Sequence, residues 1–168
     1  SSVSTVAAVQ GISATVITIE VNCTKGIQFF LVGLPDVAVR ESHERIISAL
    51  QVSGYKFPRN RIVINMAPAD IRKEGSSYDL PLAIGILAAA EELDASWLGH
   101  YMMMGELSLD GSLKPVKGIL PIAIKAREEG FKGFIVPKQN AREAAVVNDL
   151  DVYGVSTIKE VIEFIAGR

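Results

Sequence analysis

Two serines and a charged pair stand just ahead of the most apolar segment of the chain, in residues 73–81 (KEGSSYDLP). A strand is predicted over residues 61–66 and a helix over residues 81–90, so this stretch lies at a helix N-terminus. Backbone N–H groups are free at such an end and favour anions or an activated nucleophile. Residues 73–81 are therefore the first candidate site.

Ser76 and Ser77 are candidate nucleophiles, because the helix N-terminus behind them is able to stabilise an oxyanion. A serine also needs a base, either a histidine or a lysine held near neutral pKa. Lys73 is close in sequence, but we expect it to reach solvent from its place ahead of the turn. The alternative is that Ser76, Ser77 and Asp79 cap a buried helix, and the residues alone favour capping over catalysis.

Motifs for nucleotide and metal chemistry are missing from the sequence. No GxxxxGK[ST] and no GxGxxG after a strand occurs, so this segment is not expected to hydrolyse ATP by a P-loop mechanism. No CxxC or HExxH occurs either, and His43, His100 and Cys23 are far apart in sequence. We expect no metal site, and we expect His43 to be exposed on the charged face of a helix over residues 37–53.

Seven basic residues come from one third of the chain and form a candidate patch for contacts with phosphate. They are Arg40, Arg45, Lys56, Arg59, Arg61, Arg72 and Lys73. Four acidic residues interleave with them, namely Glu41, Glu44, Asp70 and Glu74. A solvated, salt-bridged surface is therefore an equal alternative to a phosphate-contacting patch.

Length and composition are those of one globular domain: 168 residues, of which 49% are hydrophobic and 21% charged. The formal net charge of −2 gives no argument for a nucleic-acid or membrane partner. One cysteine rules out an internal disulfide framework and leaves the reducing cytoplasm as the default compartment. No apolar run reaches the roughly 18 residues of a membrane span. The Ser-Ser start and the end just after a helix pattern suggest a domain excised from a longer protein.

The order of predicted elements indicates an α+β fold, a two-layer mixed sheet with helices on one side. Strands over residues 3–9, 14–22 and 27–32 suggest an antiparallel meander, and Asp110-Gly111 predicts a hairpin turn. Residues 137–140 are predicted as a loop between a buried strand over 133–136 and a short helix over 141–147. Further helices are predicted over residues 118–129 and 158–166, the last one with a capping box of Thr157 and Glu160.

Four motifs, in this order along nearly the whole chain, resemble the N-terminal domain of the Mg-chelatase-like AAA+ ATPases, the YifB/ComM competence family. They are VGLPDVAVRES at residues 32–42, NMAPAD at 65–70, KEG with YDLPLAIG at 73–85, and GEL with LKPVKGILP at 105–121. The resemblance implies a fold like the proteolytic domain of Lon protease, shared with the C-terminal domain of the RadA recombination protein.

The same resemblance implies that an AAA+ ATPase module, which uses ATP and Mg, follows this domain. ComM-type members are hexameric, ATP-driven helicases that promote branch migration when transforming DNA is integrated by recombination. DNA and further copies of the chain in a ring are thus the implied partners. Magnesium insertion into porphyrin is not inferred for this domain.

The Lon likeness implies roles for two positions. Lon-type peptidases carry their serine nucleophile two residues after the glycine of a Lys-Asp-Gly motif, which is Ser77 here. Their catalytic lysine follows a Pro-aliphatic-Gly-Gly-aliphatic run, and Leu120 stands at that position. Leucine neither takes nor gives a proton, and Lys117 and Lys125 are expected to point elsewhere from a helix. The prediction is therefore a domain without peptidase activity, in which Ser77 is vestigial.

Three functions follow from the sequence. The first is a non-catalytic accessory domain for oligomer assembly and DNA contact, without cofactor or metal of its own. The second is a serine peptidase that uses Ser77 with an unorthodox base. The third is a purely structural oligomerisation module. The candidate DNA or interface residues are Arg59, Arg61, Arg72, Lys73, Gly75, Ser76 and Asp79.

Overall fold

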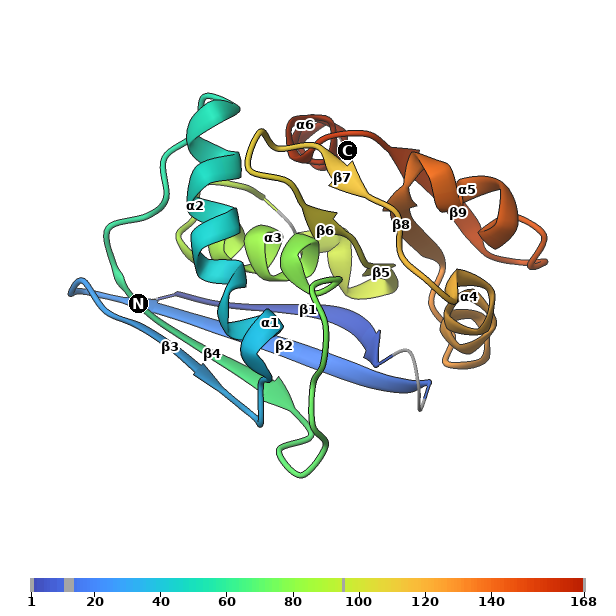
Figure 1. The fold of residues 1–168 in the computed structure, drawn as a ribbon, viewed down its shortest axis with the longest axis horizontal. Helices are drawn as coiled ribbons and strands as arrows, with labels where there is room; N and C mark the ends of the chain where they lie inside the picture. Colours follow the sequence, from blue (N-terminus) through green and yellow to red (C-terminus); the bar gives the residue numbers. More distant parts are fainter. Residues whose placement is uncertain (1, 11–13, 95, 168) are drawn as a thin grey trace.

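Seven strands form one mixed sheet, in the order β3-β4-β2-β1-β5-β8-β9 (Figure 1). The structure is a computed structural model that describes residues 2–10, 14–94 and 96–167, so the chain ends Ser1 and Arg168 lie outside it. The strands of this sheet are β1 (Ser2–Gln10), β2 (Thr15–Thr24), β3 (Phe29–Val32), β4 (Arg61–Ala67), β5 (Tyr101–Met103), β8 (Gly133–Pro137) and β9 (Asp151–Val155).

A separate hairpin of β6 (Glu106–Leu107) and β7 (Leu113–Lys114) turns at the predicted Asp110-Gly111. The α-helices are α1 (Val37–Arg40), α2 (Ser42–Val52), α3 (Asp79–Ala89), α4 (Ile119–Glu128), α5 (Lys138–Ala144) and α6 (Ile158–Ala166), and η1 (Ser96–His100) is a 3-10 helix. Thr157 caps α6 as predicted, since its hydroxyl accepts from Glu160 N at 3.1 Å.

The alternation of β2 puts its apolar residues into the core. Ile17, Ile19 and Val21 are 0% exposed, whereas Glu20 and Asn22 face solvent. Strand β1 pairs with β2 on one side and β4 pairs with it on the other, both antiparallel. Each cross-strand neighbour thus adds its apolar face to the same layer.

The predicted three-stranded meander is wrong at its third strand. β3 does not pair with β2 but runs parallel to β4, which lies between them. The reason is the connection through α1 and α2, because a helical crossover brings the chain back parallel to the strand it left. β3 is consequently an edge strand.

Helix α3 is buried almost all round, as its apolar sequence predicts, and packs on β1 and β2. Gly85 is the point of closest approach, where a Cβ would lie 2.9 Å from Val21 Cγ2. The Gly85 carbonyl also accepts a hydrogen bond from Ser4 Oγ at 2.7 Å. Gly85 thus allows α3 to approach the sheet closely.

The mixed α/β architecture expected from the sequence is confirmed. Helices α1, α2 and α3 lie on one side of strands β1 to β4 (Figure 1). At β9 helices cover both faces: a Cβ on Gly154 would lie 2.8 Å from Ala141 of α5, and the preceding residue, Tyr153, meets Phe164 of α6 with ring centroids 4.6 Å apart. Right-handed crossovers between parallel strands put α4 and α5 on the same face, opposite α6.

The loop predicted over residues 137–140 is instead the start of α5, which begins at Lys138. Pro137 stands at the N-cap with φ −57°, so the proline precedes the helix rather than interrupting it. The helical start buries Asn140, whose side-chain amide bonds both the N–H and the C=O of Val116 at 2.8 Å. These two hydrogen bonds hold the segment before α4 in place.

Candidate functional site

A pocket of about 520 Å³ opens where the segment before α3 meets the segment before α4. One wall is formed by residues 74–78 and the other by Pro115, Val116 and Lys117. Val9, Met104 and Ile122, all buried, also line the pocket. The fold therefore brings together the two motifs that the Lon likeness singles out.

Ser77 is held in this pocket through its backbone. Its carbonyl accepts from Gly105 N at 2.8 Å, and the Gly105 carbonyl in turn accepts from Leu80 N at 3.0 Å in the first turn of α3. The Ser77 side chain is half-buried, and within the described ranges its hydroxyl has no hydrogen-bond partner. A positioned hydroxyl is therefore available to a ligand but is not activated by a neighbouring base.

Ser76 has a partner of its own. Its hydroxyl donates to a carboxylate oxygen of Glu106, and the other oxygen of that carboxylate lies 3.2 Å from Lys114 Nζ. Burial raises the pKa of Glu106, but the hydrogen bonds from Ser76 and Lys114 outweigh it and the net shift is downward. A carboxylate with a lowered pKa is a poor proton acceptor, so this pair fits a structural role better than a catalytic one.

Leu120 lies in the first turn of α4, half-buried and packed against the core. It does not line the pocket, whereas Lys117 does. Lys117 is exposed and, among the described residues, forms no ion pair and no hydrogen bond. Lys117 and Ser77 thus line the same pocket, whereas position 120, from which Lys117 was expected to diverge, does not line it.

Asp36 links the pocket to the start of α1. One carboxylate oxygen accepts from Val39 N at 2.8 Å and so caps the N-terminus of α1, and the other accepts from Gly75 N at 3.0 Å. Gly75 has φ 90°, a backbone angle that favours glycine. Gly75 therefore serves to orient the serine segment against Asp36.

Lys73 is fully buried, with 0% of its surface exposed. Its ammonium donates to Gly33 O at 2.7 Å and to Pro68 O, and burial lowers its pKa while Asp70 opposes that shift. The expectation that Lys73 reaches solvent is wrong, because backbone carbonyls from two loops supply its acceptors inside the protein. Lys73 offers no surface to DNA and joins those two loops instead.

Asp79 is also 0% exposed and is paired with Arg45 of α2, at 2.6 Å to Nε and 2.9 Å to Nη2. Leu107 N donates to the same carboxylate at 3.0 Å. Burial raises the pKa of Asp79 and the bonds from Arg45 and Leu107 oppose the rise, while Asp79 raises the pKa of Arg45. Asp79 is thus a buried tie between helices and not a surface contact.

The three remaining basic candidates do not form one patch. Arg59 is exposed, and Arg61 begins β4 with its guanidinium 5.3 Å from the ring centroid of Phe30. Arg72 follows the other end of that seven-residue strand, which is about 20 Å long, and its Nε lies 3.4 Å from Glu74. Of the two alternatives for the basic residues, a salt-bridged surface describes Arg72. Arg59 is exposed and has no ion pair with any residue that the structure describes, which leaves it available to phosphate.

Two side chains that sequence reasoning missed position the two walls of the pocket, one on each wall. Gln10 Oε1 accepts from Tyr78 OH at 2.6 Å and from Glu74 N at 3.1 Å, and Asn140 fixes Val116 on the other wall. Neither lies in a motif, and Gln10 is 68 residues from Tyr78. His43 was expected to be exposed but is half-buried, its ring stacked on Phe29 at 3.9 Å.

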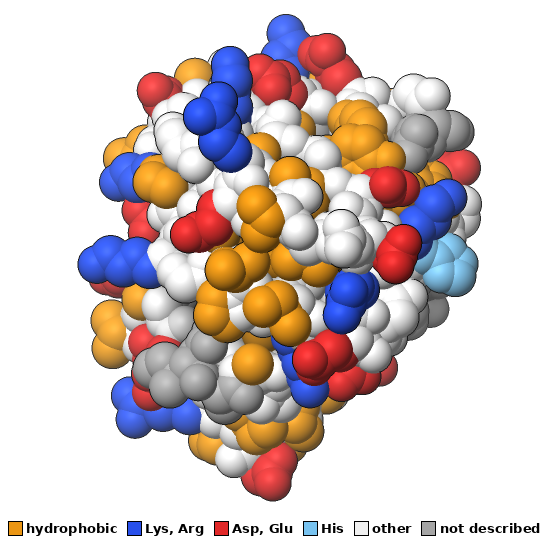
Figure 2. Space-filling model, turned by 90° about the vertical axis from the view of Figure 1, so that its right-hand side faces the viewer, with side chains coloured by type: hydrophobic (Ala, Val, Ile, Leu, Met, Phe, Trp, Pro, Cys, Tyr) orange, Lys and Arg blue, Asp and Glu red, His pale blue; other side chains and the backbone are white. Residues whose placement is uncertain are grey.

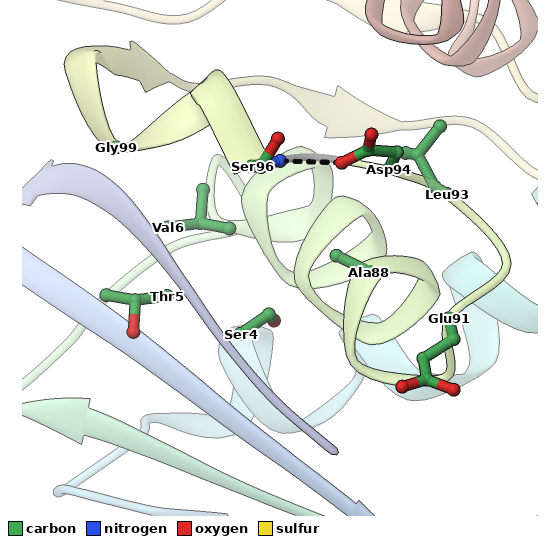
Figure 3. Close-up of a pocket in the computed structure, with 9 residues that line it drawn as sticks. All are labelled: Ser4, Thr5, Val6, Ala88, Glu91, Leu93, Asp94, Ser96 and Gly99. Carbon is green, nitrogen blue, oxygen red and sulfur yellow. Dashed lines mark hydrogen bonds between the residues drawn. The ribbon is translucent and has the colours of Figure 1, made fainter.

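Another pocket, of about 570 Å³, lies between β1 and the end of α3 (Figure 3). Its Ser4 hydroxyl is bonded to Gly85 O, and its Asp94 carboxylate accepts from Ser96 N at 3.1 Å. Over the described ranges, no cluster of side chains suited to a metal is found, and no helix there is long and apolar enough to cross a membrane. The pocket at Ser77 is therefore the stronger candidate site.

Comparison with protein families matches residues 19–140 to the family described as subunit ChlI of Mg-chelatase. The chain belongs to this ChlI family. Competence protein ComM of Haemophilus influenzae is 45% identical over 159 residues, which are 94% of this chain and 31% of that protein. YifB of Escherichia coli, an uncharacterized protein, is 42% identical with the same coverage.

This ChlI-family chain spans about a third of the length of the ComM and YifB proteins and is homologous to their N-terminal third. Lon protease 2 of Bacillus subtilis is 31% identical over 125 residues, which are 73% of this chain and 22% of that protein. The predicted resemblance to the Mg-chelatase-like family and to Lon is confirmed.

Proposed function

We propose that this chain is a non-peptidase accessory domain of a Mg-chelatase-like AAA+ protein that processes DNA, as in ComM-type branch migration. The observation that carries the proposal is the pocket itself: Ser77 is positioned, but Leu120 stands at the lysine position and packs against the core. A serine hydroxyl without a base at hydrogen-bond distance is not an effective nucleophile. The domain keeps the frame of a peptidase and serves another purpose.

That purpose is assembly of a ring and contact with DNA, in a cytoplasmic protein whose ATPase module binds ATP and Mg. The name of the Haemophilus relative, a competence protein, supports a role with DNA. Exposed Arg59, with Arg61 and Arg72, supplies the candidate phosphate contacts, and Gly75 and Ser76 stand at the pocket as candidate interface residues. Lys73 and Asp79 leave this set because both are buried.

The DNA role is tested with the protein that carries this domain and its ATPase module. Fluorescence anisotropy of labelled single- and double-stranded oligonucleotides, at several salt concentrations, compares wild type with Arg59→Gln/Arg61→Gln/Arg72→Gln. We expect about tenfold weaker binding and a shallower salt slope. The control neutralises the exposed Lys138, Arg142 and Lys159; equal binding by wild type and the arginine variant contradicts the DNA role.

A second candidate function has one observation in its favour, because Lys117 lines the same pocket as Ser77. A lysine there is a conceivable substitute for the missing base of a serine peptidase. Casein and peptide hydrolysis, with labelling by a fluorophosphonate probe, decide between the two functions. We expect neither hydrolysis nor labelling by the probe. Hydrolysis that disappears in both Ser77→Ala and Lys117→Met, but persists in Lys125→Met, would establish the peptidase.

A further inference from the structure

Exposed apolar side chains concentrate around the edge strand β3. Of the nine large apolar side chains that are exposed in the described ranges, five lie within residues 27–37. They are Ile27 (70% exposed), Phe30 (45%), Val32 (49%), Leu34 (55%) and Val37 (71%). Single exposed apolar residues need no explanation, but a cluster in eleven consecutive residues marks an interaction surface.

The outer edge of β3 has unpaired backbone groups. Ile62 N of β4 donates to Gln28 O at 2.8 Å, so the N–H and C=O groups of Phe30 also face β4. Those of Phe29 and Leu31, which alternate with them, point away from the sheet, and β3 is the last strand on this side (Figure 1). Such an edge accepts an extended strand by main-chain hydrogen bonds.

Nothing in the sequence of β3 protects this edge. Edge strands usually carry a charge, a proline or a bulge that discourages pairing, and Phe29–Val32 (FFLV) has none of these. The opposite edge of the sheet, β9, carries Asp151 and Gly154. The difference between the two edges indicates that β3 is adapted to a partner.

The surface is also held rigidly. Phe29 packs inward on His43, which anchors the strand, and Leu34 has φ 58° with its side chain exposed. Lys73 fixes that unfavourable backbone, because its N–H donates to Leu34 O at 3.0 Å and its ammonium donates to Gly33 O. A non-glycine residue kept in the left-handed region while it exposes a leucine suits a preformed contact.

We infer that the β3 edge pairs with β3 of a second copy of this chain, antiparallel about a twofold axis near Phe30. The unpaired backbone groups are those that an added strand bonds, and β3 itself carries no charge that would repel its own copy. Arg61 of β4, 5.3 Å from the Phe30 ring centroid, is a cation on this face that the pairing must accommodate. In this arrangement Phe30 and Val32 from both copies extend one apolar face, which widens a contact that four residues alone would make weakly. A twofold pair closes on itself and buries the edge in both partners.

This contact goes beyond the ring proposed above, because a twofold contact cannot repeat from subunit to subunit around a ring. It would instead join two chains face to face, or one ring to another. It also does not depend on DNA binding or on the chemistry of Ser77. Failure of either of those proposals therefore leaves this one standing, and the reverse holds too.

The test is the oligomeric state of this chain, measured by sedimentation equilibrium and light scattering from about 1 to 200 µM. We expect wild type to reach twice its mass of 18.1 kDa. Phe30→Lys and Val32→Lys put a charge on the joined face, and each should weaken pairing at least tenfold. Val146→Lys is the matched control: Val146 is 67% exposed and follows α5 in the sequence. Figure 2 shows that apolar side chains also gather on the side of the molecule where α4 and α5 lie.

A second measurement on wild type keeps the inference testable if a lysine variant fails to fold. Hydrogen exchange of the Leu31 amide, which points outward in the single chain, should slow as protein concentration rises. The Phe30 amide, bonded within the sheet, should change much less. A chain that stays monomeric at 200 µM, a pair that survives both lysine variants, or Leu31 exchange independent of concentration overturns the proposal.

Discussion

The two walls of the Ser77 pocket are held in opposite ways. The serine wall, residues 74–78, is bonded from four directions: by Gln10 at Glu74 and Tyr78, Asp36 at Gly75, Glu106 at Ser76, and Gly105 at Ser77. The lysine wall, residues 115–118, is tied by one side chain among the described residues, because Asn140 alone bonds both backbone groups of Val116. The serine wall is thus held by a network of hydrogen bonds, whereas, in the described part of the chain, the side-chain hydrogen bonds to the lysine wall all come from the Asn140 amide.

This difference shows why a well-ordered serine is weak support for catalysis. The contacts that order the serine wall also reach Asp36 at the start of α1 and Glu106 of β6. The adjoining Asp79 joins α3 to α2 and β6, so all these bonds stabilise the fold whether or not Ser77 reacts. Lys117 and Leu120 form no such contacts among the described residues. Lys117 is exposed, and Leu120 packs against the core as any apolar residue would. Selection on stability alone is therefore enough to keep the first wall, while the second is free to lose its chemistry.

The largest expected loss of stability is at Asp79, the residue that directly follows the serine wall. Asp79→Ala leaves the Arg45 guanidinium without its buried partner and Leu107 N without an acceptor. We expect a loss of about 3–5 kcal/mol in the free energy of unfolding, measured by urea denaturation. The apolar replacement of both partners, Arg45→Met/Asp79→Leu, is the control and should be less destabilised than Asp79→Ala. A loss below about 1 kcal/mol in Asp79→Ala would show that this wall does not depend on the pair.

A substitution at Asn140 tests whether the side-chain amide of this one residue holds the lysine wall in place. Asn140→Ala leaves the buried N–H and C=O of Val116 without their hydrogen-bond partner, which should lower the free energy of unfolding by about 2–3 kcal/mol. The exposed neighbour Gln139→Ala is the matched control and should change it by less than about 0.5 kcal/mol. Amide exchange at Val116 should speed up in the first variant. Equal stability of the two variants would mean that other contacts hold this wall.

A smaller effect is expected where Ser76 bonds Glu106. The lowered folded pKa of Glu106 contributes stability above the unfolded value, and that stability is lost as the pH falls through the folded pKa. Ser76→Ala should therefore cost about 1 kcal/mol at pH 7, and the difference from wild type should shrink below about pH 4. Denaturation curves at both pH values check this, with Ser76→Ala compared on a Glu106→Gln background. A difference that persists at low pH would assign the role of Ser76 to packing.

Local patterns predicted much of this fold. The strand over residues 14–22, the apolar run of α3, the turn at Asp110-Gly111 and the cap at Thr157 all depend on near neighbours, and the structure confirms them. The partner of β3 depends on a crossover through two helices, and the start of α5 depends on how the chain leaves Pro137. The first prediction failed because the deciding contact is distant in sequence, and the second failed at a helix boundary next to a proline.

The candidate site divides in the same way. Ser77 and Leu120 were found by position in a motif, and the pocket between their segments follows from the fold. The burial of Lys73 was missed, because its acceptors are carbonyls of loops 40 and five residues away, which no pattern of residue types reveals. Asp79 was taken for a cap or a contact because its partner Arg45 lies 34 residues upstream on another helix.

Replacing Ser77 should change the free energy of unfolding least. In this it differs from Ser76 in the same wall, whose hydroxyl bonds Glu106. The Ser77 backbone carbonyl holds Gly105, but the Ser77 hydroxyl bonds no described residue, so Ser77→Ala removes nothing that the fold uses. The free energy of unfolding should change by less than about 0.5 kcal/mol, in either direction, and so should that of Lys117→Met across the pocket. A serine kept for reaction at a strained or desolvated site usually makes the protein more stable when it is replaced. A gain above about 1 kcal/mol in Ser77→Ala would therefore revive the peptidase, whereas no change leaves the hydroxyl as a remnant on a wall maintained for stability.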